Sequence, residues 1–270
     1  MGSIFKILFL SAFLTSCTSL IYQPDKNLYA HPDQFKTKFE TITFDSEDGT
    51  KLTAWKLFSK KPNPKNLLIY FHGNAQNLTA HFMNSVWMAE HDYDVIIFDY
   101  RGYGISEGEP NPKGVAEDGL AFLNYGFDDY KRGTYDKFIV YGQSLGGSVV
   151  MKALEDFKHR DEIALLVLDS TFVSPRDVAK EKTFTLLSYL ISNDYTADPE
   201  LKHIDMPVLS IHSTQDPVIA YKLGETVFRS LNFSPKKEMW ILNSKGHGDV
   251  FFIEQLKYRD LFLKYVNNLY

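Results

Sequence analysis

The sequence predicts an α/β domain built on a mostly parallel sheet of eight strands, with helices on both faces. Two observations favour this fold class. From Leu67 onward, short apolar runs lack the alternation of a half-exposed strand, which is typical of strands buried on both faces of a parallel sheet. Stretches with helical periodicity separate these runs, and regular alternation of strand and helix implies right-handed crossovers and a doubly wound sheet.

The expected strands begin with a hairpin and continue with six buried runs. Residues 39–44 and 52–58 alternate apolar and polar side chains around the turn signal Glu47-Asp48-Gly49, which predicts an antiparallel pair. The apolar runs span residues 67–71, 95–98, 138–141, 164–168, 208–211 and 239–242. Helical stretches lie near residues 76–90, 113–126, 145–157, 175–193, 221–231 and 250–269.

Residues 37–270 are expected to form one domain, because the sequence has no internal repeat and no second domain boundary. Within it, the segment 171–206 is longer than a connection between two strands needs. It is either a small cap over the ligand crevice or an ordinary crossover helix with a long loop. A cap would shape the choice of substrate, since loops at the carboxyl ends of parallel strands form that crevice.

Composition is that of an ordinary globular protein and argues against nucleic acid as a partner. The chain has 270 residues, of which 44% are hydrophobic and 23% charged, with a net charge of -5. No run of basic residues could neutralise a phosphate backbone. A single cysteine, Cys17, excludes a disulfide within the chain.

The start of the chain resembles a bacterial lipoprotein signal. Lys6 precedes a mostly apolar stretch, 7–14, that is too short to span a bilayer. Leu14-Thr15-Ser16-Cys17 is similar to a lipobox, whose cysteine is lipidated and becomes the mature N-terminus. This resemblance implies a signal peptide over 1–16, a lipid anchor on Cys17 and a membrane-bound place in the bacterial cell envelope. The alternatives are a cut nearby that leaves a free thiol, or an uncleaved anchor.

Two further features of this region concern its place and shape. Thr18, rather than an aspartate that would retain a lipoprotein at the inner membrane, favours the outer membrane. Residues 17–36 contain Pro24 and Pro32 and lack apolar periodicity, so we expect them to form a tether between the anchor and the domain.

A candidate nucleophile, Ser144, follows the expected strand 138–141. The pattern Gly142-Gln143-Ser144-Leu145-Gly146 lies between that strand and a helical stretch, which is the context of a GxSxG nucleophile elbow. The glycines let strand and helix approach closely, and the helix N-terminus favours negative charge beside the serine. The alternative is a glycine-rich turn with an incidental serine.

A serine hydroxyl needs a base to take its proton and a third group to orient that base. His247 is the expected base, because it alone among the later histidines follows the last expected strand, between two glycines. Asp216, in the loop after 208–211, is the expected acid, and Asp169, at the end of the preceding strand, is the alternative. Asp249 is too close to His247 in sequence to be preferred.

An acyl-transfer site also needs two N–H donors aimed at the developing oxyanion. The N–H of Leu145, directly after the candidate nucleophile, is the first. The second is expected in the loop after Phe71, where we favour Asn74 over Ala75. His72 in the same loop is expected to brace it rather than to transfer protons.

Together these residues resemble the α/β-hydrolase superfamily, and within it the branch of BEM46-like and ABHD13- and ABHD17-like serine hydrolases. The matching pieces are residues 72–77, 99–104, the elbow around Ser144, and 245–249. The resemblance implies an α/β-hydrolase fold, a triad of Ser144, Asp216 and His247, and an oxyanion hole at Asn74 and Leu145. Ser213 and Ala220 depart from the branch, which has glycine and proline there.

The expected function is hydrolysis of a carboxylic ester or thioester through an acyl-enzyme, with a small-molecule or lipid-like acyl substrate. This chemistry requires no metal and no cofactor. Two alternatives stay open at this stage: a serine peptidase or amidase that uses the same triad, and an inactive hydrolase fold that serves as an envelope binding protein.

Overall fold

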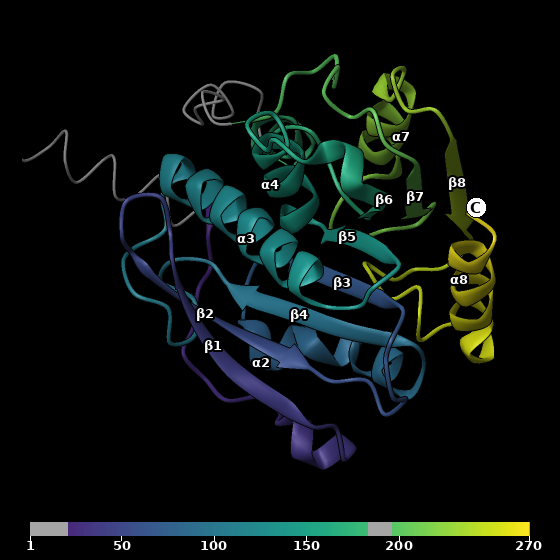
Figure 1. Cartoon of the computed structure of the whole chain (residues 1–270). Helices are drawn as coiled ribbons and strands as arrows, with labels where there is room; N and C mark the ends of the chain where they lie inside the picture. The colour runs from purple at the N-terminus through teal and green to yellow at the C-terminus, as the bar shows by residue number, and fades with distance from the viewer. Residues whose placement is uncertain (1–20, 183–195, 270) are drawn as a thin grey trace, which may run out of the picture.

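The computed structural model describes residues 21–182 and 196–269 (Figure 1). The expected signal peptide, Cys17 and the stretch 183–195 of the expected cap lie outside the described residues. The strands of the described part form one sheet, and helices cover both of its faces. The α/β-hydrolase fold expected from the sequence is therefore confirmed.

The sheet has eight strands in the order β1-β2-β4-β3-β5-β6-β7-β8. Their bounds are β1 Phe39–Asp45, β2 Lys51–Leu57, β3 Asn66–Phe71, β4 Tyr93–Asp99, β5 Lys137–Gln143, β6 Ile163–Asp169, β7 Val208–Ser213 and β8 Lys237–Leu242. β2 is antiparallel to both β1 and β4, and the remaining pairs are parallel. The carboxyl ends of β3, β5, β6, β7 and β8 therefore meet at one edge, where loops can converge.

The helices cover both faces of this sheet (Figure 1). Helices α3, α4 and α7 pack with one set of alternating strand residues, while α8 and the short helices after β3 pack with the other. The described helices are η1 Pro32–Phe35, α2 Leu78–His81, η2 Phe82–Asn84, η3 Val86–Glu90, α3 Pro112–Arg132, α4 Leu145–Ala153, η4 Arg160–Glu162, α5 Pro175–Lys182, α7 Tyr221–Ser230, η5 Glu254–Leu256 and α8 Lys257–Asn267.

Two helical expectations need correction. The stretch 76–90 is not one helix but α2, η2 and η3. The amides of Ser85 and Met88 bond to carbonyl groups three residues earlier, and Ser85, with a φ of -121°, interrupts the helical dihedral angles. The last helix starts at Lys257 rather than near 250, since the φ angles of Glu254, Gln255 and Leu256 are all positive. The expected cap is described only in part, with α5 inside it.

The described part of the expected tether packs against the domain. Tyr22 is only 6% exposed and belongs to the core on the α3 and α4 side of the sheet. Pro24 forms a parallel bridge with Gln76, and the Gly104 amide donates to the Asp25 carbonyl at 2.9 Å. Residues 22–25 thus differ from a free tether, because Tyr22 and the backbone groups of Pro24 and Asp25 find partners on the domain.

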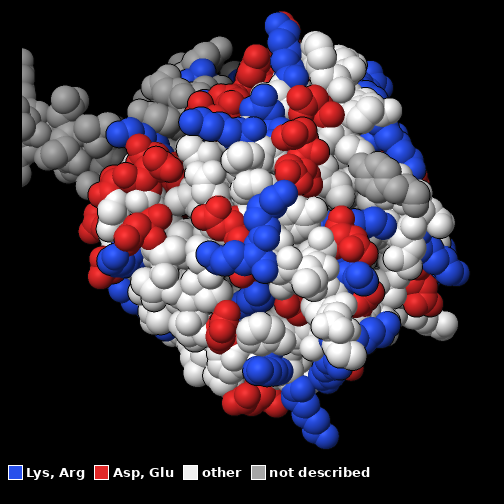
Figure 2. All heavy atoms as spheres, viewed as in Figure 1, with Lys and Arg blue, Asp and Glu red and all other residues white. Residues whose placement is uncertain are grey.

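The surface carries both signs of charge. On the face shown in Figure 2, Lys and Arg side chains alternate with Asp and Glu over α3 and the elements beside it. Among residues 21–182 and 196–269, no helix combines the length and the apolar character that crossing a bilayer requires.

Candidate active site

Ser144 occupies a strained turn between β5 and α4. Its φ is 52° and its ψ is -118°, a conformation that costs a non-glycine residue about 1–3 kcal/mol. The close approach of strand and helix explains the glycines. A Cβ on Gly142 would come within 2.6 Å of the Gly147 Cα, and one on Gly146 would collide with the Phe71 carbonyl. The turn therefore has the strand-turn-helix geometry that the expected nucleophile elbow requires.

His247 lies in the loop after β8 and is bound to Asp216. Its Nδ1–H donates to Asp216 Oδ2 at 2.8 Å, and the other carboxylate oxygen accepts the amides of Val218 and Ile219. Burial raises the pKa of Asp216, but the hydrogen bond and charge of His247 and the two amides outweigh it, so that the pKa falls below its ordinary value. Asp216 is therefore an ionised acceptor that fixes the tautomer and orientation of His247.

Asp169, the alternative acid, has other partners. Its carboxylate accepts the Tyr141 hydroxyl at 2.8 Å and the Ser170 hydroxyl at 3.0 Å. Complete burial raises the pKa of Asp169 to about 6, with Tyr141 and Ser170 acting in the opposite direction. The structure thus joins His247 to Asp216 and gives Asp169 a place behind the elbow.

The loop of His247 is attached to the ends of β5 and β6. Gln143, directly before Ser144, donates its Nε2 to the Gly248 carbonyl at 3.1 Å. Ser170, directly after β6, accepts the Gly248 amide on its Oγ at 3.1 Å, and Ser144 donates its own amide to the Asp169 carbonyl at 2.8 Å. The residue that follows His247 is therefore bonded to the residue before the serine and to the neighbouring strand end that holds the serine amide.

Gly248 is suited to this position for two reasons. Its φ is +62°, in the region where side chains other than glycine are strained, and a Cβ there would collide with the Gln143 side chain. Gln143 is itself held by Tyr70 Oη at 2.8 Å and Asn84 Nδ2 at 3.2 Å. The histidine loop therefore rests on a side-chain network anchored in β3 and β5.

The loop after β3 lies over the serine, as expected for an oxyanion hole. A Cβ on Gly73 would be 3.5 Å from the Ser144 Cβ. Asn74 uses its side chain elsewhere, since Oδ1 accepts the Tyr103 hydroxyl at 2.7 Å and the Gln23 amide at 3.0 Å, and Nδ2 donates to the Ile21 carbonyl at 2.7 Å. The side chain of Asn74 is therefore bound to Tyr103 and to the N-terminal segment, which leaves its backbone N–H as the group for the expected oxyanion role.

Leu145, the other expected donor, is the first residue of α4. The first amides of a helix have no carbonyl partner within the helix and are therefore free to bind an anion. The loop that carries Asn74 is bent by two consecutive left-handed residues, Ala75 with φ 61° and Gln76 with φ 58°.

Two histidines brace this loop from behind. His72, as expected, donates Nδ1–H to the Gly73 carbonyl at 2.7 Å and is fully buried. His81 stacks on it, with ring centroids 4.9 Å apart, and donates Nε2–H to the Ala75 carbonyl at 3.1 Å. Burial lowers the pKa of His81 to about 3, so its ring is neutral near pH 7.

Sequence reasoning missed His81, Ser170 and the side chain of Gln143. A histidine within a helical stretch has no spacing that distinguishes a brace from a surface residue. Gln143 lies in the variable position of the GxSxG pattern, and only contact with Gly248 reveals its role. Within the described ranges, no cluster of three or more His, Cys, Asp or Glu side chains could hold a metal ion.

The strand order, with a serine turn after β5 and a carboxylate-bound histidine after β8, defines the chain as an α/β hydrolase. The profile of the family described as serine aminopeptidase, S33 matches residues 62–197. The chain belongs to this family.

Several known proteins are similar to this chain over most of its length. YfhR of Salmonella typhimurium is 31% identical, over 97% of this chain and 95% of its own length. Bem46 of Schizosaccharomyces pombe is 29% identical, over 70% of this chain and 64% of its own length, which agrees with the resemblance found in the motifs. The esterase Pf2001 of Pyrococcus furiosus has the same fold, with a TM-score of 0.71 at 18% identity, over 91% of this chain and 96% of its own.

Proposed function

We propose that this protein is a serine hydrolase that cleaves carboxylic esters or thioesters through an acyl-enzyme. The observation that carries the proposal is the position of His247. An ionised carboxylate holds its Nδ1, and the next residue, Gly248, is bonded to Gln143, directly before Ser144, and to Ser170 at the end of β6. This arrangement leaves Nε2 as the nitrogen that can accept the serine proton.

In the proposed reaction, Ser144 Oγ attacks the acyl carbonyl carbon while His247 Nε2 takes the hydroxyl proton. The carbonyl oxygen becomes an oxyanion that the N–H groups of Leu145 and Asn74 stabilise. His247 then gives the proton to the departing alcohol or thiol, which leaves the acyl group on Ser144. Water repeats the sequence with His247 as base, which releases the carboxylic acid and restores the serine.

The experiment that tests this proposal replaces Ser144 with alanine. We expect kcat/KM on p-nitrophenyl esters to fall about 10⁴-fold or more, because the nucleophile is lost while the oxyanion donors stay. A fluorophosphonate probe should label the wild type and the Ser230→Ala control at the end of α7, but not Ser144→Ala. Full activity of Ser144→Ala, or absence of labelling in the wild type, would refute the proposal.

The family description favours a second candidate, a serine aminopeptidase or amidase on the same residues. Amide cleavage uses the same attack but needs protonation of a poorer leaving group. Comparing kcat/KM for p-nitrophenyl esters with that for aminoacyl p-nitroanilides separates the two candidates. A preference for the anilides would replace the ester proposal while retaining the triad.

We also propose that the protein is held at a bacterial envelope membrane through a lipid on Cys17. The support is the sequence Leu14-Thr15-Ser16-Cys17 and the apolar stretch before it. Several acyl chains on one residue give stable attachment, since each buried methylene adds about 0.8 kcal/mol. Cys17→Ala should move the protein from the membrane fraction to the soluble fraction and remove the lipid mass. Unchanged retention and mass would exclude this anchor.

A further inference from the structure

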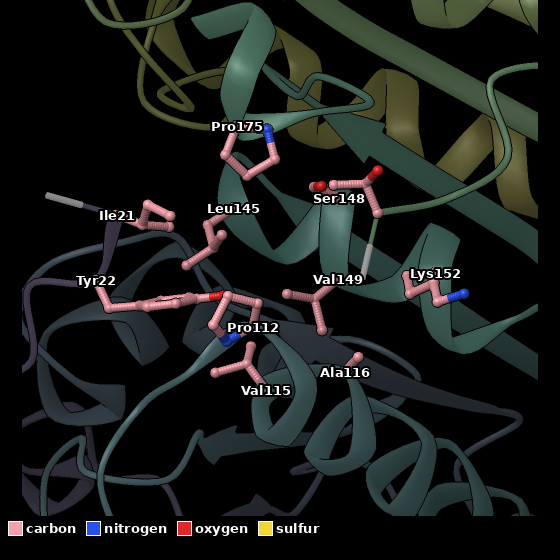
Figure 3. A pocket seen from close by; sticks show the side chains of 11 residues that line it. Ile21, Tyr22, Pro112, Val115, Ala116, Leu145, Ser148, Val149, Lys152 and Pro175 are labelled. Carbon is pink, nitrogen blue, oxygen red and sulfur yellow. The ribbon is translucent and has the colours of Figure 1, made fainter. Parts of the chain in front are cut away.

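The N-terminal segment joins the domain beside both proposed oxyanion donors. Asn74 donates its Nδ2 to the Ile21 carbonyl at 2.7 Å and accepts the Gln23 amide on its Oδ1 at 3.0 Å. Figure 3 shows the ring of Tyr22, between these two residues in the chain, extending toward α3 and lying beside Leu145 at the start of α4. The segment therefore meets the domain at the proposed oxyanion hole.

The proposed lipid on Cys17 is separated from this contact by very little chain. Ile21 is four residues after Cys17, and an extended chain advances at most about 3.6 Å per residue, so the two residues are no more than about 14 Å apart. A domain of this size is about 45 Å across. A membrane that holds the lipid must therefore meet the domain on the side that carries the oxyanion loop.

The same side of the domain carries an apolar patch, formed by Leu28 and Ile105. Within the described ranges, these are the most exposed large hydrophobic side chains, at 70% and 74%. Ile105 lies in the loop after β4, where the Gly104 amide donates to the Asp25 carbonyl at 2.9 Å. The residue before Leu28 accepts Asn77 Nδ2 at 2.8 Å, just after the oxyanion loop. Both parts of the patch are thus attached to the N-terminal segment and to the loops around the site.

The charges beside the apolar patch indicate how it would bind. Glu107 and Glu109, in the loop of Ile105, are exposed, and Lys26 is exposed in the segment of Leu28. Attraction to anionic lipids requires a cluster of basic side chains, which these two segments lack. Contact with a bilayer would therefore be apolar, with the lipid on Cys17 supplying most of the affinity.

We propose that the apolar patch lies in the interfacial layer of a lipid bilayer, with the side of the domain that carries the oxyanion loop resting on the membrane. The inference rests on the proposed hydrolase and on the proposed lipid at Cys17, and it names the source of the substrate. An acyl ester embedded in the membrane reaches Ser144 from the bilayer surface rather than from bulk water.

A fluorescent label tests the position of the domain on the bilayer. Because Cys17 is the only cysteine and its thiol carries the proposed lipid, a cysteine introduced elsewhere is the one free thiol. Ile105→Cys and the control Phe233→Cys are labelled and reconstituted, as full lipidated chains, into phosphatidylcholine vesicles. Phe233 is 51% exposed between α7 and β8, at the edge of the sheet where the parallel strands begin. Spin-labelled lipid should quench the label at position 105 about twofold or more and leave the label at position 233 unchanged.

A kinetic measurement tests the source of the substrate. It compares the hydrolysis of p-nitrophenyl palmitate embedded in the vesicles with that of p-nitrophenyl acetate in water. In the double variant Leu28→Glu and Ile105→Glu, the ratio of the two rates should fall about tenfold or more, because charged side chains are costly to bring into the interfacial layer. Phe233→Glu is the matched control and should keep the wild-type ratio.

Three outcomes concern the orientation. If lipid does not quench the label at position 105 while the wild type cleaves p-nitrophenyl acetate, the orientation is wrong and the hydrolase stands. Protection of that label from soluble iodide without quenching by lipid would show that a second protein covers the apolar patch, which also overturns the inference. Quenching with an unchanged ratio of rates would keep the orientation and refute the membrane as the source of the substrate.

The two proposals on which the inference rests are judged separately. If ester cleavage and fluorophosphonate labelling both fail, the hydrolase proposal falls, while quenching by lipid still judges the orientation. If the mass of the purified chain shows no lipid on Cys17, the short connection to the membrane does not exist, and the orientation is overturned together with the anchor.

Discussion

Gly248 is held at both its amide and its carbonyl, and this one residue joins the histidine loop to the serine turn. Ser170 accepts the Gly248 amide and donates its own hydroxyl to Asp169. Gly248 is thus connected through Ser170 to a buried carboxyl group. Asp169 is not the partner of His247, yet it lies close enough for the charge of His247 to lower its pKa. The ionisation of Asp169 is therefore coupled to the stability of the site.

Asp169→Asn tests this coupling through pH. The pKa of Asp169 is raised from 3.8 to about 6, so between these values the folded protein binds more protons than the unfolded chain. The free energy of unfolding of the wild type, measured relative to that of Asp169→Asn, should therefore be highest below pH 4. It should fall by about 3 kcal/mol by pH 7. Urea unfolding of both proteins from pH 4 to 7 measures the difference. A difference that does not vary with pH would contradict the buried carboxyl.

At the scale of elements, the N-terminal segment and the loop after β3 behave as one unit. Residues 21–25 contribute no catalytic group, but they contact the loop through Asn74 and Gln76, and Asp25 also accepts the Gly104 amide from the loop after β4. The loop needs such support, because Ala75 and Gln76 both adopt left-handed conformations that side chains disfavour.

Asn74→Ala keeps the backbone N–H and removes only the side-chain bonds to Ile21, Gln23 and Tyr103. We expect kcat on p-nitrophenyl esters to fall about tenfold to a hundredfold, because the oxyanion donor loses its fixed position. Asn124→Ala, on the exposed side of α3, is the matched control and should retain wild-type kcat. Equal kcat in both variants would show that the loop holds its shape without the N-terminal segment.

On the scale of the whole molecule, the sheet separates two apolar cores, and each core contains fully buried aromatic side chains. Phe98 of β4 is 0% exposed and stacks on Phe122 of α3 with ring centroids 4.1 Å apart. This contact attaches α3 to the face of the sheet that α4 and α7 also cover.

Phe98→Ala should lower the free energy of unfolding by about 3–5 kcal/mol, since a buried aromatic side chain leaves a cavity. Phe252→Ala, at a site that is 48% exposed, should change it by about 0.5 kcal/mol or less. Denaturant unfolding with the midpoint and slope analysed separately measures both. Similar losses in the two variants would place Phe98 outside the core.

Features that depend on neighbouring residues could be predicted from the sequence, and features that depend on contacts between distant segments could not. Six apolar runs locate β3 to β8, and the alternation of the hairpin locates β1 and β2, because the burial of a strand leaves a local signal in its own residues. The pattern around Ser144 is likewise local, since it occupies five consecutive residues. The choice of Asp216 over Asp169 required geometry, since both follow parallel strands. Contacts between distant segments, such as Gln143 with Gly248 and Asn74 with Gln23, leave no pattern in either segment alone.

The contact of residues 21–25 with the oxyanion loop also bears on how the protein can be produced. A purification tag or fusion partner joined directly before Ile21 would strain the hydrogen bonds that Asn74 makes with Ile21 and Gln23. It would thereby disturb the site although it is far from Ser144 in the sequence. The carboxyl end follows α8, which packs on the other face of the sheet from α4 (Figure 1). Tags are therefore better attached there.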